Sequence, residues 1–165
     1  MKSKKFLIIT FALFMLFALA ISPAEASRKP VITADKTFFD FTTGLYVLDG
    51  NVRVEVRNRV ITANHAKVSV SRMEVLATGG VNLKMRDFVF SGESIYVYGS
   101  RNFAKIDGGA SYSAPGLTVT ADRAEYNWNT KIATLKGNVK VNENGNIWES
   151  DHVIYNMETK TFIQK

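Results

Sequence analysis

Close copies of Thr120-Ala121-Asp122-Arg123-Ala124-Glu125-Tyr126 recur along the chain at a constant spacing. In each copy a small residue is followed by an acidic residue or an amide, in the pairs Ala34-Asp35, Ala63-Asn64, Gly92-Glu93, Ala121-Asp122 and Ser150-Asp151. Every interval is 29 residues, and a second mark keeps the same step at Gly50, Gly79, Gly108 and Gly137. Two independent marks that share one period indicate a repeat protein.

Five tandem units follow one another, with bounds 31–59, 60–88, 89–116, 117–145 and a partial 146–165. β-Branched and aromatic residues dominate them without helical spacing, which predicts strands. Apolar residues before and after each Ala-Asp-type pair fall on opposite parities, which indicates a bulge or bend there. A small residue with an acid or amide fits a tight corner. The recurring glycine predicts a kink or the close approach of another backbone.

Within a unit, apolar and charged residues alternate, as in Val52, Val54 and Val56 against Arg53, Glu55 and Arg57. Such alternation gives a sheet one dry face and one wet face. We expect about three short strands per unit and an elongated all-β domain, in which two facing sheets enclose an apolar interior. The third unit departs most from the pattern, so its interior should be narrower or looser. A parallel β-solenoid is the alternative, because the sequence does not give strand direction.

The first residues lie outside the repeat and read as a secretory signal peptide, residues 1–26. Lys2, Lys4 and Lys5 precede an apolar run from Phe6 to Ile21, and Ala24-Glu25-Ala26 fits a cleavage site before Ser27. An uncleaved anchor is the alternative, although 16 residues are short for a membrane span. The rest, 27–165, is expected to form a single domain. Removing three lysines and one glutamate leaves 18 basic and 14 acidic residues, a net charge of +4. An exported protein of this modest charge is not expected to bind nucleic acid.

Enzyme signatures are not found in the sequence, and we expect no catalytic residues, no metal and no cofactor. His65 and His152 occupy the same position of two units and are expected at the surface. The regular spacing of Asp35, Asp122 and Asp151 marks them as corner residues, not catalytic acids. Trp128 and Trp148 are expected to pack in the core, with a ligand-binding surface as the alternative.

The motifs resemble the OstA/LptA family of lipopolysaccharide-transport proteins. The matching stretches are Val31-Ile32-Thr33-Ala34-Asp35, Thr62-Ala63-Asn64-His65-Ala66, Ala121-Asp122-Arg123-Ala124-Glu125-Tyr126, Gly50-Asn51-Val52 and Gly137-Asn138-Val139. The resemblance implies a twisted β-jellyroll of consecutive antiparallel strands in the periplasm of a two-membrane bacterium. It also implies head-to-tail self-association through strand edges, and contacts with an inner-membrane LptC-like protein and an outer-membrane LptD-like translocon.

The implied function is to carry lipopolysaccharide from the inner to the outer membrane with the lipid A acyl chains shielded in an apolar trough. Each methylene moved into water costs about 0.8 kcal/mol, so a chain of roughly 12–14 carbons costs about 10 kcal/mol. We expect the lipid to contact inward-facing residues, namely Val54, Val56, Val68, Val70, Leu83, Met85, Tyr126 and Val141. The alternative is a structural β-repeat protein of the envelope with a filled core and no lipid ligand.

Overall fold

A computed structural model of the protein describes residues 31–56 and 58–164. The predicted signal peptide, residues 1–26, lies outside them. Strands and one 3-10 turn account for the regular structure: β1 (Val31–Thr33), β2 (Lys36–Asp40), β3 (Leu45–Val56), β4 (Arg59–Ser69), β5 (Glu74–Met85), β6 (Phe88–Tyr98), η1 (Gly99–Arg101), β7 (Phe103–Ala114), β8 (Leu117–Asn127), β9 (Ile132–Glu143), β10 (Asn146–Asn156) and β11 (Thr161–Gln164). The all-β prediction is confirmed.

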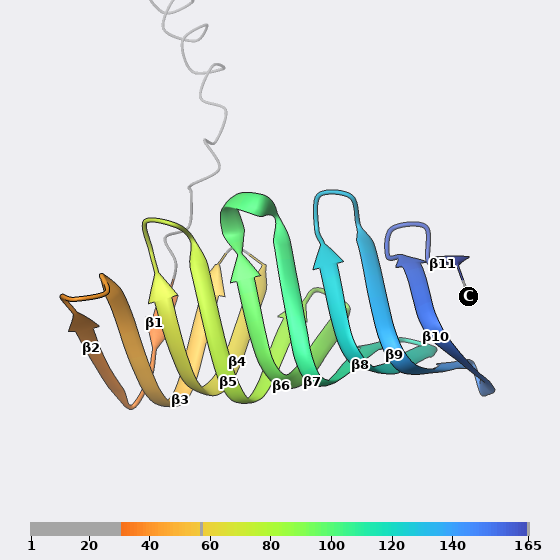
Figure 1. Ribbon diagram of the computed structural model, residues 1–165, viewed down its shortest axis with the longest axis horizontal. Helices are drawn as coiled ribbons and strands as arrows, with labels where there is room; N and C mark the ends of the chain where they lie inside the picture. Colours follow the sequence, from red (N-terminus) through yellow and green to blue (C-terminus); the bar gives the residue numbers. More distant parts are fainter. Residues whose placement is uncertain (1–30, 57, 165) are drawn as a thin grey trace, which may run out of the picture.

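All of these strands belong to one open sheet, in which neighbours along the chain from β3 onward pair antiparallel. Its order follows the sequence from β1 and β2, which both pair with β3, to β11. Figure 1 shows the strands succeeding one another along the long axis of the molecule. The antiparallel pairing rules out the parallel solenoid.

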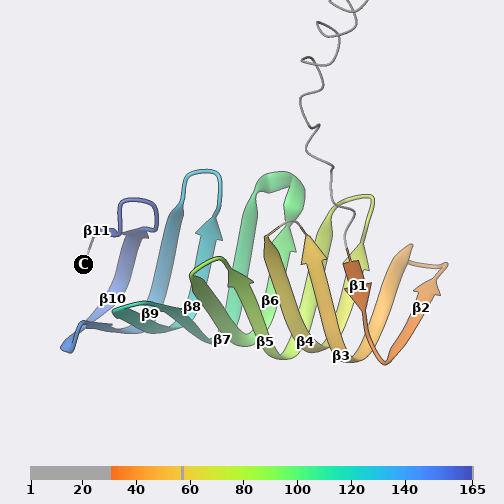
Figure 2. The ribbon, with the colours of Figure 1, turned by 180° about the vertical axis from the view of Figure 1, so that it is seen from behind.

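Each long strand bends near its middle, and the bends lie together along the lower side of the molecule in Figures 1 and 2. Every bend coincides with a register shift in the sheet, for example between Thr120 and Arg123 of β8. The predicted bulges at the Ala-Asp-type pairs are thus confirmed. The bends fold the sheet into two walls. The first wall ends at the turns around residues 58, 86, 115 and 144, and the second wall ends at the turns around 42, 72, 100, 130 and 159.

Two expectations about the strands require correction. Each of the three middle units contributes two long strands and not three short ones, because a strand continues through its bulge from one wall into the other. The two facing sheets are the two walls of one hydrogen-bonded sheet. Only in the first unit does the bend interrupt the strand, so that β1 and β2 flank Ala34 and Asp35.

The corner geometry explains the period of the sequence. At each corner the acid or amide of one strand lies against the glycine of the next strand, and this glycine has a positive φ, as in Gly50, Gly79, Gly108 and Gly137. The following residue, asparagine or glycine, also has a positive φ, which these two residue types tolerate best. Asn138 donates hydrogen bonds to the carboxylate of Asp122, with Nδ2 3.0 Å from Oδ2, and Asn51 bonds to Asp35 in the same way at 2.8 Å.

Replacing Gly108 with alanine should destabilise the protein more than replacing its neighbour Gly109. Both residues have a positive φ, 78° and 74°, so alanine costs about 1–2 kcal/mol at either position. A Cβ at Gly108 would also lie 2.5 Å from the Cβ of Glu93, whereas a Cβ at Gly109 would meet open space. We expect at least about 1 kcal/mol more loss for Gly108→Ala in urea unfolding. Equal losses would contradict this account of the corner.

The core runs the length of the molecule between the two walls. Its most buried large side chains include Leu48, Leu83, Phe90, Ile106 and Leu135. Of the two expected departures of the third unit, a looser interior is wrong, because Phe90, Ile95 and Ile106 are all fully buried. Gly92 stands where the other units carry alanine or serine, since a Cβ there would collide with the side chain of Ile106.

Candidate lipid-binding groove

Two cavities lie between the walls, one toward each end of the molecule. The N-terminal cavity has a volume of about 490 Å³, and the C-terminal cavity has a volume of about 380 Å³. Both fall in the range of roughly 300–1,000 Å³ that is typical of small-molecule sites. Side chains of both walls line each of them, and we refer to the two cavities together as the groove.

Aliphatic side chains line the N-terminal cavity. Val54, Val56, Ile61 and Leu83 project from the first wall, and Val68, Val75 and Val97 project from the second. These positions alternate with exposed polar residues such as Arg53 and Lys67, because successive side chains of a strand point to opposite faces. An interior of this kind can hold a hydrocarbon chain and offers few polar partners.

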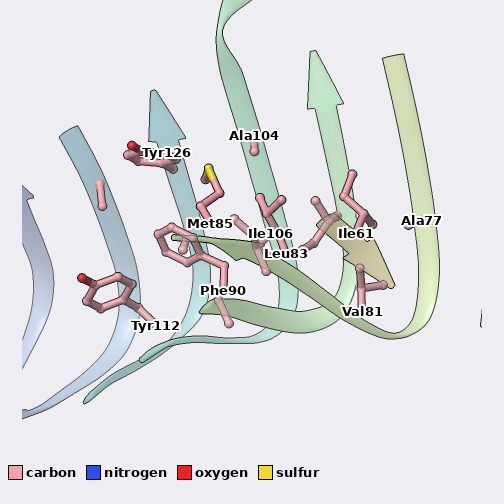
Figure 3. Close-up of a cluster of buried hydrophobic side chains, with 14 of the residues drawn as sticks. Ile61, Ala77, Val81, Leu83, Met85, Phe90, Ala104, Ile106, Tyr112 and Tyr126 are labelled. Carbon is pink, nitrogen blue, oxygen red and sulfur yellow. The ribbon is translucent and has the colours of Figure 1, made fainter. Parts of the chain in front are cut away.

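Aromatic side chains dominate the interior toward the C-terminal end. The ring centroid of Phe90, in the first wall, lies 5.6 Å from that of Tyr126 in the second wall and 5.2 Å from that of Tyr112. Tyr112 in turn contacts Tyr155 across the groove, with 5.9 Å between ring centroids. Figure 3 shows Phe90 and Met85 beside the two tyrosines Tyr112 and Tyr126. These rings hold the walls together by packing.

A cation–π contact separates the two cavities. The guanidinium of Arg59, at the start of β4, lies 4.5 Å from the ring centroid of Trp128, just after β8. Both residues line both cavities. The Trp128 ring is held in place by Asn102, because Nε1 of Trp128 donates a hydrogen bond of 2.8 Å to Oδ1 of Asn102. Arg59 and Trp128 therefore form a bridge between the rims.

The predicted lipid-contact residues take three kinds of position. Val54, Val56, Val68, Val70 and Leu83 line the N-terminal cavity, and Met85 and Tyr126 line the C-terminal cavity. Val141 is fully buried and lies outside both cavity linings. Val70 is 51% exposed, because β4 ends at Ser69 and the side chain stands at the mouth of the cavity. Lipid contact by any of these residues remains a prediction.

Sequence reasoning missed Arg59 and expected Trp128 in the core, with a ligand-binding surface as the alternative. Trp128 is buried, as expected, yet it also lines both cavities. His65 is exposed and pairs with Asp49, whereas His152 is half-buried, which corrects its expected surface position. Within 31–56 and 58–164, no three His, Cys, Asp or Glu side chains cluster as they would around a metal ion. The same part of the chain contains no helix with the length and apolar character of a membrane span.

Burial raises the pKa of the Tyr112 hydroxyl well above its ordinary value of 10.0, and it raises the pKa of Tyr126 and of Tyr155 as well. These tyrosines stay protonated in the folded protein at a pH where they ionise in the unfolded chain. Their contribution to stability is therefore fully present below pH ~10 and is lost as the pH rises above it.

Raising the pH from 8 to 11 should lower the free energy of unfolding, measured in urea, by less in Tyr112→Phe than in the unchanged protein. Tyr46→Phe, at an exposed position, is the control and should leave the loss unchanged. A loss as large in Tyr112→Phe as in the unchanged protein would contradict a raised pKa of the Tyr112 hydroxyl in the folded state.

Comparison with known proteins assigns the chain to a family. Residues 31–161 match a family model described as LptA/(LptD N-terminal domain) LPS transport protein. The chain belongs to this family. The match spans the first four repeat units and most of the fifth, so the family resemblance seen in the sequence is confirmed.

A solved structure supports the fold independently. The structure of LptH, described as the LptA homologous periplasmic component of the conserved lipopolysaccharide transport device from Pseudomonas aeruginosa, matches with a TM-score of 0.62. The two chains are 18% identical, and the match covers 70% of this chain and 87% of that one. At this identity the likeness establishes the LptA-like jellyroll fold. No curated protein sequence matches the chain.

Proposed function

We propose that this lipopolysaccharide-transport protein works in the periplasm and shields the acyl chains of lipopolysaccharide in the groove between its two walls. The observation that carries this proposal is the aliphatic N-terminal cavity, whose lining comes from both walls. Burial of a hydrocarbon chain there would offset a cost of about 0.8 kcal/mol per methylene in water. The expected signal peptide and the periplasmic relative support the location.

The groove alone suffices for carriage, because holding a lipid out of water requires an apolar surface and no bond making. We therefore assign the protein no catalytic role and no cofactor. The sugar part of the lipid would remain outside the rims, where the exposed polar turn residues lie. Transfer along the protein would then need only similar, weak binding at successive positions of the groove.

The ends of the sheet are the proposed contacts with other transport components. Among the described residues, β1 and β2 at one end and β11 at the other each pair on one side only. Unpaired strand edges are templates for adding a strand from another molecule. We propose that they carry head-to-tail self-association and contacts with an LptC-like protein and an LptD-like translocon. Such joints would extend the groove from one molecule into the next.

Binding of intact and fully deacylated lipopolysaccharide tests the proposal. Trp128 lines the groove, so its fluorescence in a Trp148→Phe background reports on ligand entry. We expect intact lipopolysaccharide to shift the emission and the deacylated form to have no effect at the same concentration. Equal responses to both forms would refute shielding of acyl chains. No response to either form from a folded protein would favour a structural role.

A further inference from the structure

The two cavities differ in the charge of their rims. The C-terminal cavity is lined by four cationic side chains, those of Arg59, Arg86, Lys131 and Lys160. Two carboxylates, those of Asp87 and Glu158, also line it. The N-terminal cavity has Arg59 and Glu74, and Glu74 is already engaged by Arg72 at 3.0 Å. Positive charge therefore gathers over one half of the groove only.

The cations come from both rims and face the same opening. Arg86 lies in the turn between β5 and β6 on the first wall. Lys131 and Lys160 lie in the turns that follow β8 and β10 on the second wall. Arg86 and Lys160 are exposed, and neither forms an ion pair with another residue of 31–56 or 58–164. Their charge is available to a ligand at the mouth of the cavity.

Comparison of equivalent positions in the repeat units shows that Lys131 and Lys160 are particular to the C-terminal units. Met73, Asn102, Lys131 and Lys160 occupy equivalent turn positions 29 residues apart, and all four have φ between 54° and 62°. Asparagine is the non-glycine residue that best tolerates this left-handed conformation, and lysine is less suited to it. The position changes from apolar to polar to cationic along the molecule. A backbone requirement alone does not explain two lysines over the C-terminal cavity.

Beneath the cationic rim the cavity is amphipathic. Tyr112, Tyr126 and Tyr155 line it together with Phe88 and Met157. The hydroxyl groups of Tyr112 and Tyr126 are visible in Figure 3. Neutral tyrosines present an apolar ring to a hydrocarbon chain and a hydrogen-bond donor to an oxygen of a headgroup. The site therefore fits the junction between an acyl chain and an anionic headgroup.

We propose that the C-terminal cavity is a phosphate subsite, in which Arg86 and Lys160, aided by Lys131 and Arg59, bind a phosphate group of the carried lipid. The inference rests on the proposed function and adds a specificity to it. Guanidinium and ammonium groups form charge-assisted hydrogen bonds to phosphate oxygens. The lipid would be held here by both its chains and its phosphate, and in the N-terminal cavity by its chains alone.

The test compares diphosphorylated lipid A with the same lipid after removal of its phosphates, so that the acyl chains are identical. We expect the protein to bind the phosphorylated form about tenfold more tightly. The double variant Arg86→Gln, Lys160→Gln should lose this preference and keep its affinity for the dephosphorylated lipid. The control Lys67→Gln, Lys84→Gln removes the same charge from exposed strand positions and should keep the preference.

Each outcome is distinct. Equal binding of both lipids, or a preference that persists in the Arg86→Gln, Lys160→Gln variant, would overturn the phosphate subsite and leave acyl-chain carriage intact. Failure of both lipids to bind would overturn the proposed function and this inference with it. Inorganic phosphate alone should not bind at the same concentration, and tight binding of it would identify a free-anion site instead.

Discussion

Replacing Phe90 with alanine is expected to destabilise the protein by about 3–5 kcal/mol, as large-to-small changes of buried aromatic residues do. Phe90 is fully buried, and its ring lies within 6 Å, centroid to centroid, of Phe88, Tyr112 and Tyr126. Removing it opens a void where the two walls meet. Because the flanking strands are held by the same sheet, they cannot close the gap without breaking register.

The control for this prediction is Phe41→Ala in the turn between β2 and β3. Phe41 is 90% exposed, so its loss should change the free energy of unfolding by less than about 1 kcal/mol. Urea unfolding followed by circular dichroism measures both variants. A Phe90→Ala protein as stable as Phe41→Ala would show that the aromatic cluster does not hold the walls together.

Placing tryptophan at Val56 is expected to weaken lipopolysaccharide binding by at least about tenfold, equivalent to 1.4 kcal/mol, with the fold retained. Val56 is half-buried at the end of β3 and lines the N-terminal cavity. The indole ring of a tryptophan there would occupy space proposed for acyl chains. Val56 is the last residue of β3, so the substitution lies at the end of the pairing between β3 and β4.

Leu76→Trp provides the matched control. Leu76 is 37% exposed and follows Val75 in β5, so its side chain lies on the outer face. The same tryptophan there should leave binding unchanged. Isothermal titration or the fluorescence of a bound lipid probe measures the affinity of each variant relative to that of the unchanged protein. Unaltered affinity in a folded Val56→Trp protein would mean that the chains do not enter this cavity.

The corners of the fold could be predicted from the sequence because they are local and repeated. The parity change at Ala121-Asp122 gives the bulge, and Gly137 gives the close approach of the next strand. Both depend on residues that are adjacent in the sequence or about half a repeat step apart, as Asp122 and Gly137 are. The same period predicts the order of the strands along the molecule, since every unit must contact its neighbours.

The strand count could not be predicted because a bulge looks like a strand end in the sequence. At Asn64 the alternation changes phase whether the chain stops or bends, and only the backbone pairing of β4 with β5 on both sides of it decides. For the same reason two walls of one sheet could not be distinguished from two sheets.

The contents of the groove depend on contacts between distant residues. Arg59 and Trp128 are far apart in the sequence, and no pattern indicates that one stacks on the other. The third unit was expected to be narrower or looser because Ala110-Ser111-Tyr112-Ser113 replaces the valine pattern, yet the ring of Tyr112 packs against Phe90 and fills the space. Alternation places a side chain on the inner face and does not decide whether it meets a packed core or a cavity.

Photo-crosslinking to lipopolysaccharide from adjacent positions of β3 tests whether acyl chains lie between the two walls. Val54 is 2% exposed and lines the N-terminal cavity, whereas the side chain of Arg53 is 48% exposed and pairs with Glu55 on the outer face. A diazirine-bearing residue at position 54 is predicted to crosslink to lipid, and the same residue at position 53 is not. A folded protein that crosslinks at neither position, or equally at both, would contradict an acyl-chain groove between the walls.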